Sequence, residues 1–319
     1  MILPDSTEIN INFELLTPQT HENITIIPIK TEIKSKLDIL TLKKGMKLGL
    51  VEVKELKEST VNTLTVKNKA VTPLLLIDGE ELVGGDQNRI VNTTTLIPAK
   101  NETKISVSCT ERGRWKYKNE FKSSPNIANY KTRSTKEHAR YSKQPIQDQI
   151  WSSIDTLESN LCFKSPTSSM SESYENQKTN LNNMMKSFSI ANEQNGILIM
   201  INGEIKGFEI LLNPEIYKDF HEKIIKSYLI DTEIKTSIFT INIDVAKNMI
   251  QNAIDSIFVN KESSGLEQSY EFENGEGLGT LHIYKNEIIH WSYFKKEIEN
   301  IIKDDFAENN ETESNTLKL

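Results

Sequence analysis

The pattern of hydrophobic and polar positions predicts strands in the first third of the chain. Between residues 8 and 115, hydrophobic residues alternate with polar ones or form short runs, as they do in half-buried and fully buried strands. The clearest runs lie at 25–29, 47–53, 63–66 and 74–77. Turn-forming stretches at 43–45 and 98–101 separate them, so we expect an antiparallel β-sandwich or a rolled sheet, and not parallel strands joined by helices.

The middle of the chain, residues 123–192, is rich in Ser, Asn, Lys and Gln, and its hydrophobic residues follow a helical period. One stripe begins directly after Pro145, a residue that can open a helix, and a second stripe begins at Tyr174. The stripes comprise Ile146, Ile150, Ile154, Leu157 and Leu161, and then Tyr174, Leu181, Met184, Met185 and Phe188. Such stripes are typical of ordinary core packing, so this part reads as a helical bridge.

Mixed strands and helices follow from Gly196 onward. The dipeptide Asn202-Gly203 lies between two hydrophobic runs, which predicts a β-hairpin with a type I′ turn. Helical periods come next at 216–228 and 245–257, and strands return at 269–272 and 281–284. The last residues are polar and acidic, which is typical of a disordered tail.

These patterns together predict an α+β protein. We expect an N-terminal antiparallel β-sandwich or rolled sheet, a helical bridge and a C-terminal mixed α/β lobe. The corresponding divisions are a β-rich lobe at 1–125, the bridge at 126–192, the mixed lobe at 193–305 and a disordered tail at 306–319.

Composition and charge narrow the class of protein. The 319 residues are 37% hydrophobic and 26% charged, which is typical of a globular protein. A formal net charge of −7 gives no general attraction to phosphate backbones, so we expect no general nucleic-acid binding.

Cysteine usage and hydrophobic runs bear on the location in the cell. The two cysteines, Cys109 and Cys162, lie far apart, which favours a reducing compartment over a disulfide framework or a cysteine metal site. The first residues lack the basic and hydrophobic segments of a secretory signal, and the longest hydrophobic runs are much too short to cross a bilayer. We therefore expect a cytoplasmic protein without a membrane partner.

Polar chemistry is concentrated between Asp78 and Trp115. Glycines and carboxylates follow the hydrophobic run 74–77, and Glu80 and Glu81 are candidates for acid and base roles in a partly buried pocket. Neighbouring residues of a strand point to opposite faces, so only one of the two would enter a given pocket. The alternative is that both belong to a solvated turn.

Three residues with directional hydrogen-bonding groups follow, Gln87, Asn88 and Arg89. Amide and guanidinium groups can bind a carboxylate, a phosphate or a base edge. Alternation places Gln87 and Arg89 on one face of the strand, and Asn88 with Asn92 on the other. The alternative is ordinary polarity on an exposed strand.

The segments 89–97 and 105–115 are expected to pair as a hairpin. In the preferred register Arg89 opposes Glu111, which keeps one hydrophobic face intact and forms a charge pair. A shift by one residue would set Arg89 against Arg112, which is unfavourable without an anionic ligand.

Cys109 and Trp115 are further candidates in this stretch. A thiolate can act as a nucleophile, but no histidine occurs between residues 78 and 115, so we expect Cys109 to pack in the core. Trp115 can stack on a base or on Arg114, or serve as a core anchor. A basic stretch at 131–143 can form either an anion-facing edge or a solvated face.

Metal binding has little direct support. The five histidines show no paired ligand spacing, so we name no metal ligand and assign no cofactor. A magnesium ion held by carboxylates stays open, because oxygen ligands gathered in space leave weak sequence signatures. Neither a Walker-type loop nor a Gly-x-Ser-x-Gly elbow is present, which disfavours P-loop NTPases and α/β-hydrolases.

The motifs of this polar stretch resemble those of a known family. They are Asp78-Gly79-Glu80-Glu81-Leu82, Gln87-Asn88-Arg89, Asn92, Val107-Ser108-Cys109 and Glu111-Arg112-Gly113-Arg114-Trp115. They look like the ARPP domain, named for its association with ADP-ribosylglycohydrolase and rhodanese-phosphatase proteins. The resemblance is specific through residues 74–115 and looser over the rest of the chain. The chain departs from the family pattern at Gly85-Asp86, where Ala-Lys is usual, and at Ile105-Ser106, where Ile-Pro is usual.

The resemblance implies the processing or sensing of NAD-derived or ADP-ribose-type molecules. We therefore expect an enzyme, a hydrolase, that acts on such a nucleotide-like ligand. Its expected catalytic carboxylates are Glu80, Glu81 and Glu111, and its expected ligand-binding residues are Gln87, Asn88, Arg89, Asn92 and Arg114. The alternatives are a non-catalytic nucleotide sensor or interaction module, and a structural protein in which these polar residues are buried ties. Protein partners stay unassigned.

Overall fold

The computed structural model describes residues 1–32, 35–56, 61–230, 232–235, 239 and 241–296. The expected disordered tail at 306–319, and the end of the expected mixed lobe, lie outside the described residues. Helices and strands mix along the chain, and most strands pair in large antiparallel sheets, so the predicted α+β class is confirmed.

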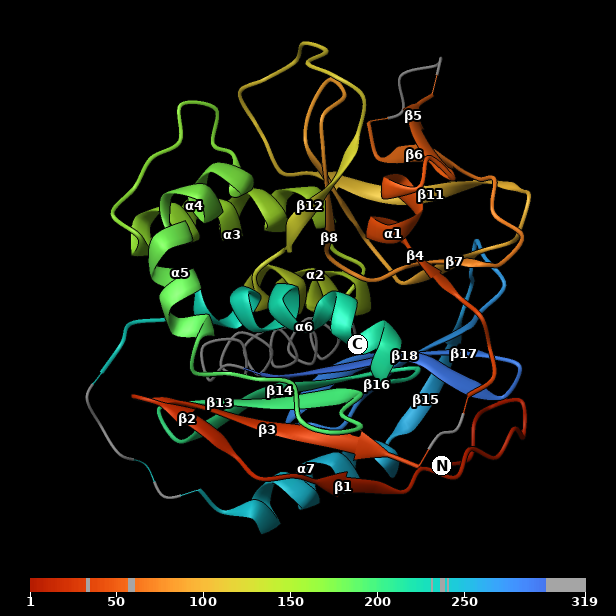
Figure 1. The fold of residues 1–319 in the computed structure, drawn as a ribbon, viewed down its shortest axis with the longest axis vertical. Coiled ribbons are helices and arrows are strands. Elements are labelled where there is room, and N and C mark those ends of the chain that lie inside the picture. Colours follow the sequence, from red (N-terminus) through yellow and green to blue (C-terminus); the bar gives the residue numbers. More distant parts are fainter. Residues whose placement is uncertain (33–34, 57–60, 231, 236–238, 240, 297–319) are drawn as a thin grey trace, which may run out of the picture.

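A nine-stranded antiparallel sheet forms the base of the molecule (Figure 1). Its order is β1-β3-β13-β14-β18-β17-β16-β15, with β2 paired to β3. The strands are β1 (Phe13–Leu15), β2 (Gln19–His21), β3 (Ile24–Thr31), β13 (Gly196–Ile201), β14 (Glu204–Leu211), β15 (Ile257–Lys261), β16 (Gln268–Glu273), β17 (Gly277–Tyr284) and β18 (Glu287–Lys295). Alternating residues of these strands feed two hydrophobic clusters, one on each face.

A curled half-barrel lies above this base (Figure 1). A six-stranded sheet of order β12-β8-β9-β11-β6-β5 and a three-stranded sheet of order β10-β7-β4 share one hydrophobic interior. The strands are β4 (Leu40–Thr41), β5 (Val51–Glu55), β6 (Thr63–Asn68), β7 (Leu74–Leu76), β8 (Glu80–Val83), β9 (Arg89–Val91), β10 (Thr95–Ile97), β11 (Glu102–Cys109) and β12 (Lys122–Ile127).

Helices separate and cover the two β units. The helices are α1 (Leu42–Lys47), α2 (Tyr130–Tyr141), α3 (Ile146–Asn160), α4 (Met170–Asn176), α5 (Lys178–Met185), α6 (Pro214–Leu229) and α7 (Ile243–Ile254). Figure 1 shows α2 and α6 between the nine-stranded sheet and the half-barrel, and α7 on the opposite face of that sheet. The central position of α2 makes its polar residues part of the interior.

Features that depend on local sequence match their predictions. The hairpin of β13 and β14 turns at Asn202 and Gly203, which both adopt positive φ (55° and 76°), as a type I′ turn requires. Helix α3 begins directly after Pro145, and the predicted helical periods at 216–228 and 245–257 correspond to α6 and α7. The second period was predicted to extend too far, because α7 ends at Ile254 and Ile257 begins β15. The stripe that begins at Tyr174 forms two short helices, α4 and α5.

Two predictions about strands were wrong. Residues 42–47, expected to include a breaker and the start of a strand, form α1, and β5 begins only at Val51. The expected strand 89–97 is split into β9 and β10, which belong to different sheets. The split arises because the chain bends at residues 92–94 and β10 pairs with β7.

The predicted register of β9 and β11 was wrong by two residues. Arg89 lies opposite Cys109, and not opposite Glu111. A shift by two preserves which residues face the core, so the hydrophobic pattern alone could not distinguish the registers. Glu111 lies beyond the end of β11, where its carboxylate binds Arg114.

The basic stretch 131–143 is not a solvated face. Residues 131–141 lie in α2, in which Arg133 and Lys136 are almost fully buried, whereas Lys143 lies beyond the helix and is exposed. Arg133 donates two hydrogen bonds, of 3.0 and 2.7 Å, to the carboxylate of Glu209 in the nine-stranded sheet. Lys136 pairs with Asp78 at the start of the half-barrel motif. Buried charges are tolerated when they are paired in this way.

The first strands of the chain lie in the base of the molecule. Strand β3 pairs along its length with β13, from Ile24 with Ile201 to Ile29 with Gly196. Residues 13–31 therefore share a sheet with the last third of the described chain. The division at 125 and 192 stays a prediction.

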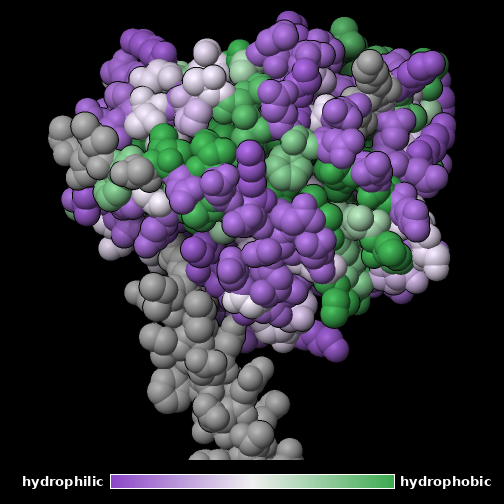
Figure 2. All heavy atoms as spheres, turned by 90° about the horizontal axis from the view of Figure 1, so that it is seen from below, coloured by the Kyte–Doolittle hydropathy of each residue, from purple (hydrophilic) through white to green (hydrophobic). Residues whose placement is uncertain are grey.

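The surface below the sheet is shown in Figure 2. Hydrophobic side chains reach the surface at several places between larger hydrophilic areas. In the part of the chain that the structure describes, no helix has the length and apolar character needed to cross a membrane.

Candidate functional site

Arg114 holds together the loop that follows β8. Its Nε atom donates a 2.8 Å hydrogen bond to Oε2 of Glu111, and its Nη2 atom lies 2.7 Å from the same oxygen. The guanidinium also donates to the side-chain oxygen of Asn88 and to four backbone carbonyl oxygens, those of Gly84, Gly85, Asp86 and Lys116. These bonds use the donors that a phosphate would need.

Glu111 is engaged on both oxygens. Besides Arg114, it accepts a 3.1 Å hydrogen bond from the Thr167 hydroxyl and a 3.4 Å bond from the backbone N–H of Asn88. The side-chain amide of Gln87 donates to the backbone carbonyl of Glu111 at 2.8 Å. Through these bonds, Glu111 joins the ends of β9 and β11 to Thr167 in the segment before α4.

Arg89 extends this network into the half-barrel. Its side chain is only 2% exposed, and Nη1 donates to the side-chain oxygen of Gln87 at 3.2 Å. Its Nη2 atom lies 3.8 Å from Oε1 of Glu55 on β5. Cys109 faces Arg89 across the ladder and is buried, and burial raises the pKa of its thiol. These observations fit a packed cysteine better than a nucleophile.

Glu80 and Glu81 lie on opposite faces of β8, as alternation predicts. Glu80 is fully buried, accepts a 2.9 Å hydrogen bond from the ammonium of Lys223 on α6, and accepts another of 3.1 Å from the backbone N–H of Ile77. It is therefore a tie between the half-barrel and α6.

Glu81 is also fully buried, and no described residue makes a hydrogen bond of normal geometry to either of its oxygens. Burial raises its pKa to about 7, and the nearby Glu111 adds to the shift, while Ser124 opposes it. A carboxyl group with a pKa near neutrality is suited to proton transfer. Burial therefore makes Glu81 a candidate for proton transfer in this motif.

The remaining candidates lie elsewhere. Asn92 follows β9, donates a 3.0 Å hydrogen bond from its amide to Ser106, and accepts a bond from Lys136 at its backbone oxygen. Trp115 is 65% exposed and is not a core anchor. The structure thus brings together Gln87, Asn88, Arg89, Glu111 and Arg114, separates Glu80 from Glu81, and leaves Asn92 and Trp115 outside that group.

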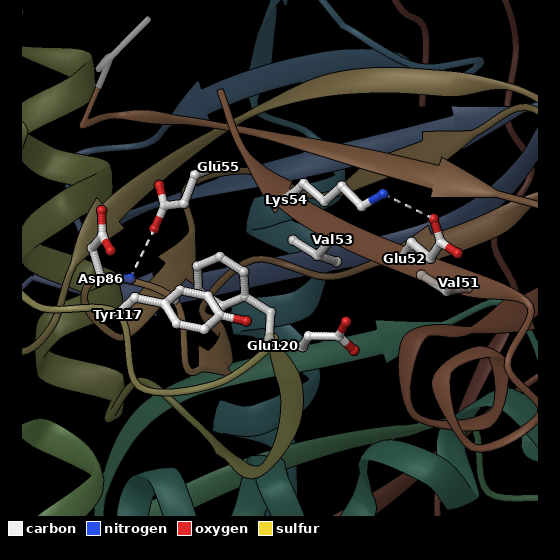
Figure 3. A pocket seen from close by; sticks show the side chains of 10 residues that line it. Val51, Glu52, Val53, Lys54, Glu55, Asp86, Tyr117 and Glu120 are labelled. Carbon is white, nitrogen blue, oxygen red and sulfur yellow. Dashed lines mark hydrogen bonds and ion pairs between the residues drawn. The ribbon is translucent and has the colours of Figure 1, made fainter. Parts of the chain in front are cut away.

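A cavity of about 440 Å³ opens beside this network, and we call it the acidic cleft (Figure 3). It is lined by Val51, Glu52, Val53, Lys54, Glu55, Gly85, Asp86, Tyr117, Glu120 and Phe121. Figure 3 shows Glu55 and Asp86 at one end and the Tyr117 ring with Glu120 along one side. Four lining residues carry carboxylates and one carries an ammonium group, so the cleft favours positive charge.

Glu55 is the best-positioned carboxylate of the acidic cleft. Its Oε1 atom accepts a 3.2 Å hydrogen bond from the backbone N–H of Asp86 and lies near Arg89. Gly85 makes this approach feasible, because it has a φ of 55° and a Cβ there would collide with the Phe121 ring and press on Glu55. The Lys54 ammonium, by contrast, pairs with Glu52.

Sequence reasoning missed Glu55. The sequence could have indicated this residue, because Val51, Val53 and Glu55 share one face of β5. A carboxylate on an otherwise hydrophobic face of a strand indicates a functional or structural role. Among the described residues, no group of three or more His, Cys, Asp and Glu side chains is arranged to hold a metal ion. Magnesium binding therefore gains no support from geometry.

The fold and the site define a class of protein. It is an α+β protein whose half-barrel carries a polar network at its strand ends beside an acidic cleft. A comparison with family models matches residues 12–294 to ARPP-1, the ARG and Rhodanese-Phosphatase-superfamily-associated Protein domain. Because this match spans most of the sequence, the chain belongs to the ARPP-1 family, as its motifs predicted. Searches among curated proteins and among solved structures found no match.

Proposed function

We propose that the acidic cleft binds the ribosyl-nicotinamide end of an NAD-derived nucleotide. The protein then hydrolyses the N-glycosidic bond between the nicotinamide ring and C1′ of the ribose. The observation that carries this proposal is the set of Glu55, Asp86 and Glu120 around a cavity with an aromatic side. The nicotinamide ring of such a nucleotide is a cation, and carboxylates and aromatic faces both attract cations.

The same carboxylates suit the chemistry of the bond. Cleavage at C1′ of a ribose develops positive charge on the sugar ring, and fixed negative charge stabilises that transition state. Water attacks C1′, the C–N bonding electrons move to the nicotinamide nitrogen, and a cleft carboxylate takes the proton from water. The products are neutral nicotinamide and an ADP-ribose-type nucleotide.

In this proposal, the residues of the polar motif position the carboxylates of the acidic cleft. Arg89 and the Asp86 N–H both contact Oε1 of Glu55, so they fix the carboxylate without entering the reaction. Arg114 and Glu111 hold the loop that carries Asp86. The family name, which refers to ADP-ribosylglycohydrolase through its ARG component, agrees with chemistry at a ribose carbon.

Nicotinamide release tests the proposal. The protein is incubated with NAD, nicotinamide mononucleotide or ADP-ribose, in magnesium and in EDTA, and nicotinamide is measured by chromatography. We expect release from the first two compounds in both buffers. Glu55→Gln should lower the rate about 100-fold or more, because it removes a fixed charge that faces the transition state.

A matched control is Glu102→Gln at the start of β11. This carboxylate is exposed and lies outside the acidic cleft, so the rate should not change. Saturable NAD binding without nicotinamide release would favour the non-catalytic sensor. Absence of both binding and release would refute the assignment of the cleft.

A further inference from the structure

The loop between β11 and β12 presents aromatic and basic side chains beside the acidic cleft. Residues 115–118, which we call the rim segment, read Trp-Lys-Tyr-Lys, and all of them are exposed. Tyr117 lines the acidic cleft, where its ring lies along one side (Figure 3), whereas the other residues of the segment do not line it. The rim segment therefore extends from the wall of the cleft to the surface outside it.

Backbone hydrogen bonds hold the rim segment against the loop that follows β8. The Arg114 guanidinium donates to the backbone oxygen of Lys116 at 2.9 Å, and the N–H of Lys118 donates to the backbone oxygen of Gly85 at 3.1 Å. The N–H of Gly85 in turn donates to the backbone oxygen of Asn119 at 2.8 Å. The exposed side chains thus project from a fixed backbone, which lowers the conformational entropy that a ligand must overcome when it binds.

Trp115 keeps most of its flat apolar surface in water. The residue is 65% exposed, and in the described part of the chain no aromatic ring or cation stacks on it. The neighbouring Arg114, which could have covered the ring, is engaged by Glu111 instead. Exposed aromatic rings held in this way are typical of surfaces that bind a second flat group, and nucleotide bases stack on such rings.

Lys116 and Lys118 carry the positive charge that remains available in this loop. The other cations of the loop, Arg112 and Arg114, are engaged by carboxylates. Among the residues that the structure describes, no carboxylate pairs with the ammonium group of either lysine. Both ammonium groups are therefore available to an anion.

The acidic cleft beside these lysines has the opposite charge. Four of its lining residues carry carboxylates, and its one ammonium group pairs with one of the four. The carboxylates belong to Glu52, Glu55, Asp86 and Glu120, and the ammonium group belongs to Lys54. A phosphate group is therefore repelled from the cleft and attracted to the two lysines outside it.

A dinucleotide with its nicotinamide end in the acidic cleft carries its groups in a matching order. Its cationic ring and first ribose are followed by two phosphates, a second ribose and adenine. In the chain, Tyr117 lines the cleft, Lys116 precedes it, and Trp115 precedes Lys116. Cation, anion and flat ring thus each have a partner of the appropriate chemistry.

We propose that Lys116 and Lys118 bind the pyrophosphate of the NAD-derived nucleotide and that Trp115 stacks on its adenine ring. The rim segment then selects an adenine dinucleotide over smaller nicotinamide compounds. This inference rests on the proposed function, because it places the second half of the same ligand.

Aromatic and basic side chains also occur together in sites for single-stranded nucleic acid. Such sites follow the strand with a positively charged groove over several nucleotides. Here the cleft beside the two lysines is acidic, and the formal net charge of the chain is −7. These features favour one dinucleotide over a longer strand.

Three substrates of increasing length test the proposal on the full chain. Nicotinamide riboside has no phosphate, nicotinamide mononucleotide has one, and NAD adds a second phosphate and adenosine. The value of kcat/KM for nicotinamide release is measured for each. Trp115→Ala should lower the ratio of this value for NAD to that for the mononucleotide at least about tenfold, because NAD alone carries adenine. Lys116→Gln combined with Lys118→Gln should lower the ratio for the mononucleotide to the riboside at least about fivefold.

Two control variants make similar changes away from the rim segment. Ile257→Ala removes an apolar side chain that is 83% exposed on β15, and Lys100→Gln combined with Lys104→Gln removes two exposed ammonium groups from the half-barrel. None of these residues lines the acidic cleft, so both ratios should stay at their native values. Circular dichroism checks that every variant folds.

Tryptophan fluorescence measures adenine binding without any reaction. AMP should quench the emission of the native chain saturably, and Trp115→Ala should lose this quenching. Quenching by AMP and NAD without nicotinamide release would refute the hydrolysis and support the rim segment. Nicotinamide release with ratios that the rim variants do not change would refute the rim segment and leave the hydrolysis standing. The rim segment is also refuted if neither AMP nor NAD quenches the emission, or if an oligoadenylate does so at a lower concentration than NAD.

Discussion

At the scale of single residues, the polar motif contains a network of mutually hydrogen-bonded side chains and a buried carboxyl group outside that network. Arg114, Glu111 and the two amides at 87 and 88 bind one another and the backbone around them. Glu81 sits in the same motif, fully buried, and no residue in the described part of the chain makes a hydrogen bond of normal geometry to either oxygen. Its protonation must therefore couple to folding.

Glu81→Gln should change how stability depends on pH. Burial raises the pKa of Glu81 from 4.5 to about 7, so below pH 4.5 the group is protonated in both the folded and the unfolded chain. As the pH rises from 4.5 to about 7, the Glu81 carboxyl group ionises in the unfolded chain while it stays protonated in the folded chain. The free energy of unfolding therefore falls by roughly 3 kcal/mol over this range. Urea unfolding at pH 5, 6, 7 and 8 should show this loss in the native chain and a smaller one in the variant.

Glu80→Gln is the matched control on the other face of β8. It leaves the Lys223 ammonium buried without its carboxylate, so it should lower stability at every pH in that range. If Glu81→Gln and the native chain show the same pH dependence, the carboxyl group is not protonated in the folded state.

At the scale of elements, α2 connects the two β units through charge. Arg133 reaches down to Glu209 in β14, and Lys136 reaches the opposite way to Asp78. Burial opposes the ionisation of Glu209, but Arg133 and then His290 hold its pKa at about 2. Gly79 has a φ of 78°, and a Cβ there would lie 2.5 Å from the Arg133 side chain, so the motif glycine leaves space for this connection.

Arg133→Met should destabilise the protein by roughly 3–5 kcal/mol, because it leaves Glu209 charged and buried. Arg133→Met combined with Glu209→Met should recover much of this loss, because neither charge then remains unpaired. Urea unfolding of the single and double variants measures both effects. Equal destabilisation by the single and the double variant would show that the pair is not coupled.

These elements also show what could be predicted from sequence. The Asn202-Gly203 hairpin and helices α3, α6 and α7 follow from local patterns, and they are confirmed. The β9–β11 register and the burial of α2 depend on partners far along the chain. The sequence of a basic helix predicts a solvent-exposed surface, because it does not show that Glu209 pairs with Arg133 in the fold. In the same way, the sequence does not show that Glu55 lies next to the buried Arg89.

At the scale of the whole molecule, the base sheet joins the two ends of the described chain. Strand β3 lies between β1 and β13, and its residues Ile24, Ile26, Ile27 and Ile29 are buried. Removal of this strand would expose one edge of β13 and part of both hydrophobic clusters of the sheet. The half-barrel motif depends on the same base through α2.

A chain that begins at residue 32 should therefore not fold. It lacks the pairing partner of β13 and leaves buried side chains of the base exposed. Circular dichroism and urea unfolding check this, and we expect no cooperative transition. A peptide of residues 1–31 added in trans should restore the transition at least in part. A cooperative transition of the shortened chain alone would contradict the prediction.

The pairing of β3 with β13 also has a consequence during synthesis on the ribosome. The two strands lie about 170 residues apart, so β3 leaves the exit tunnel long before its partner exists. At a translation rate of roughly 5–20 residues per second, the isoleucines of β3 stay in contact with solvent or with a chaperone for roughly 10–30 s before β13 is made. The nascent chain is therefore most open to aggregation while the half-barrel is being made, and the base can close only near the end of translation.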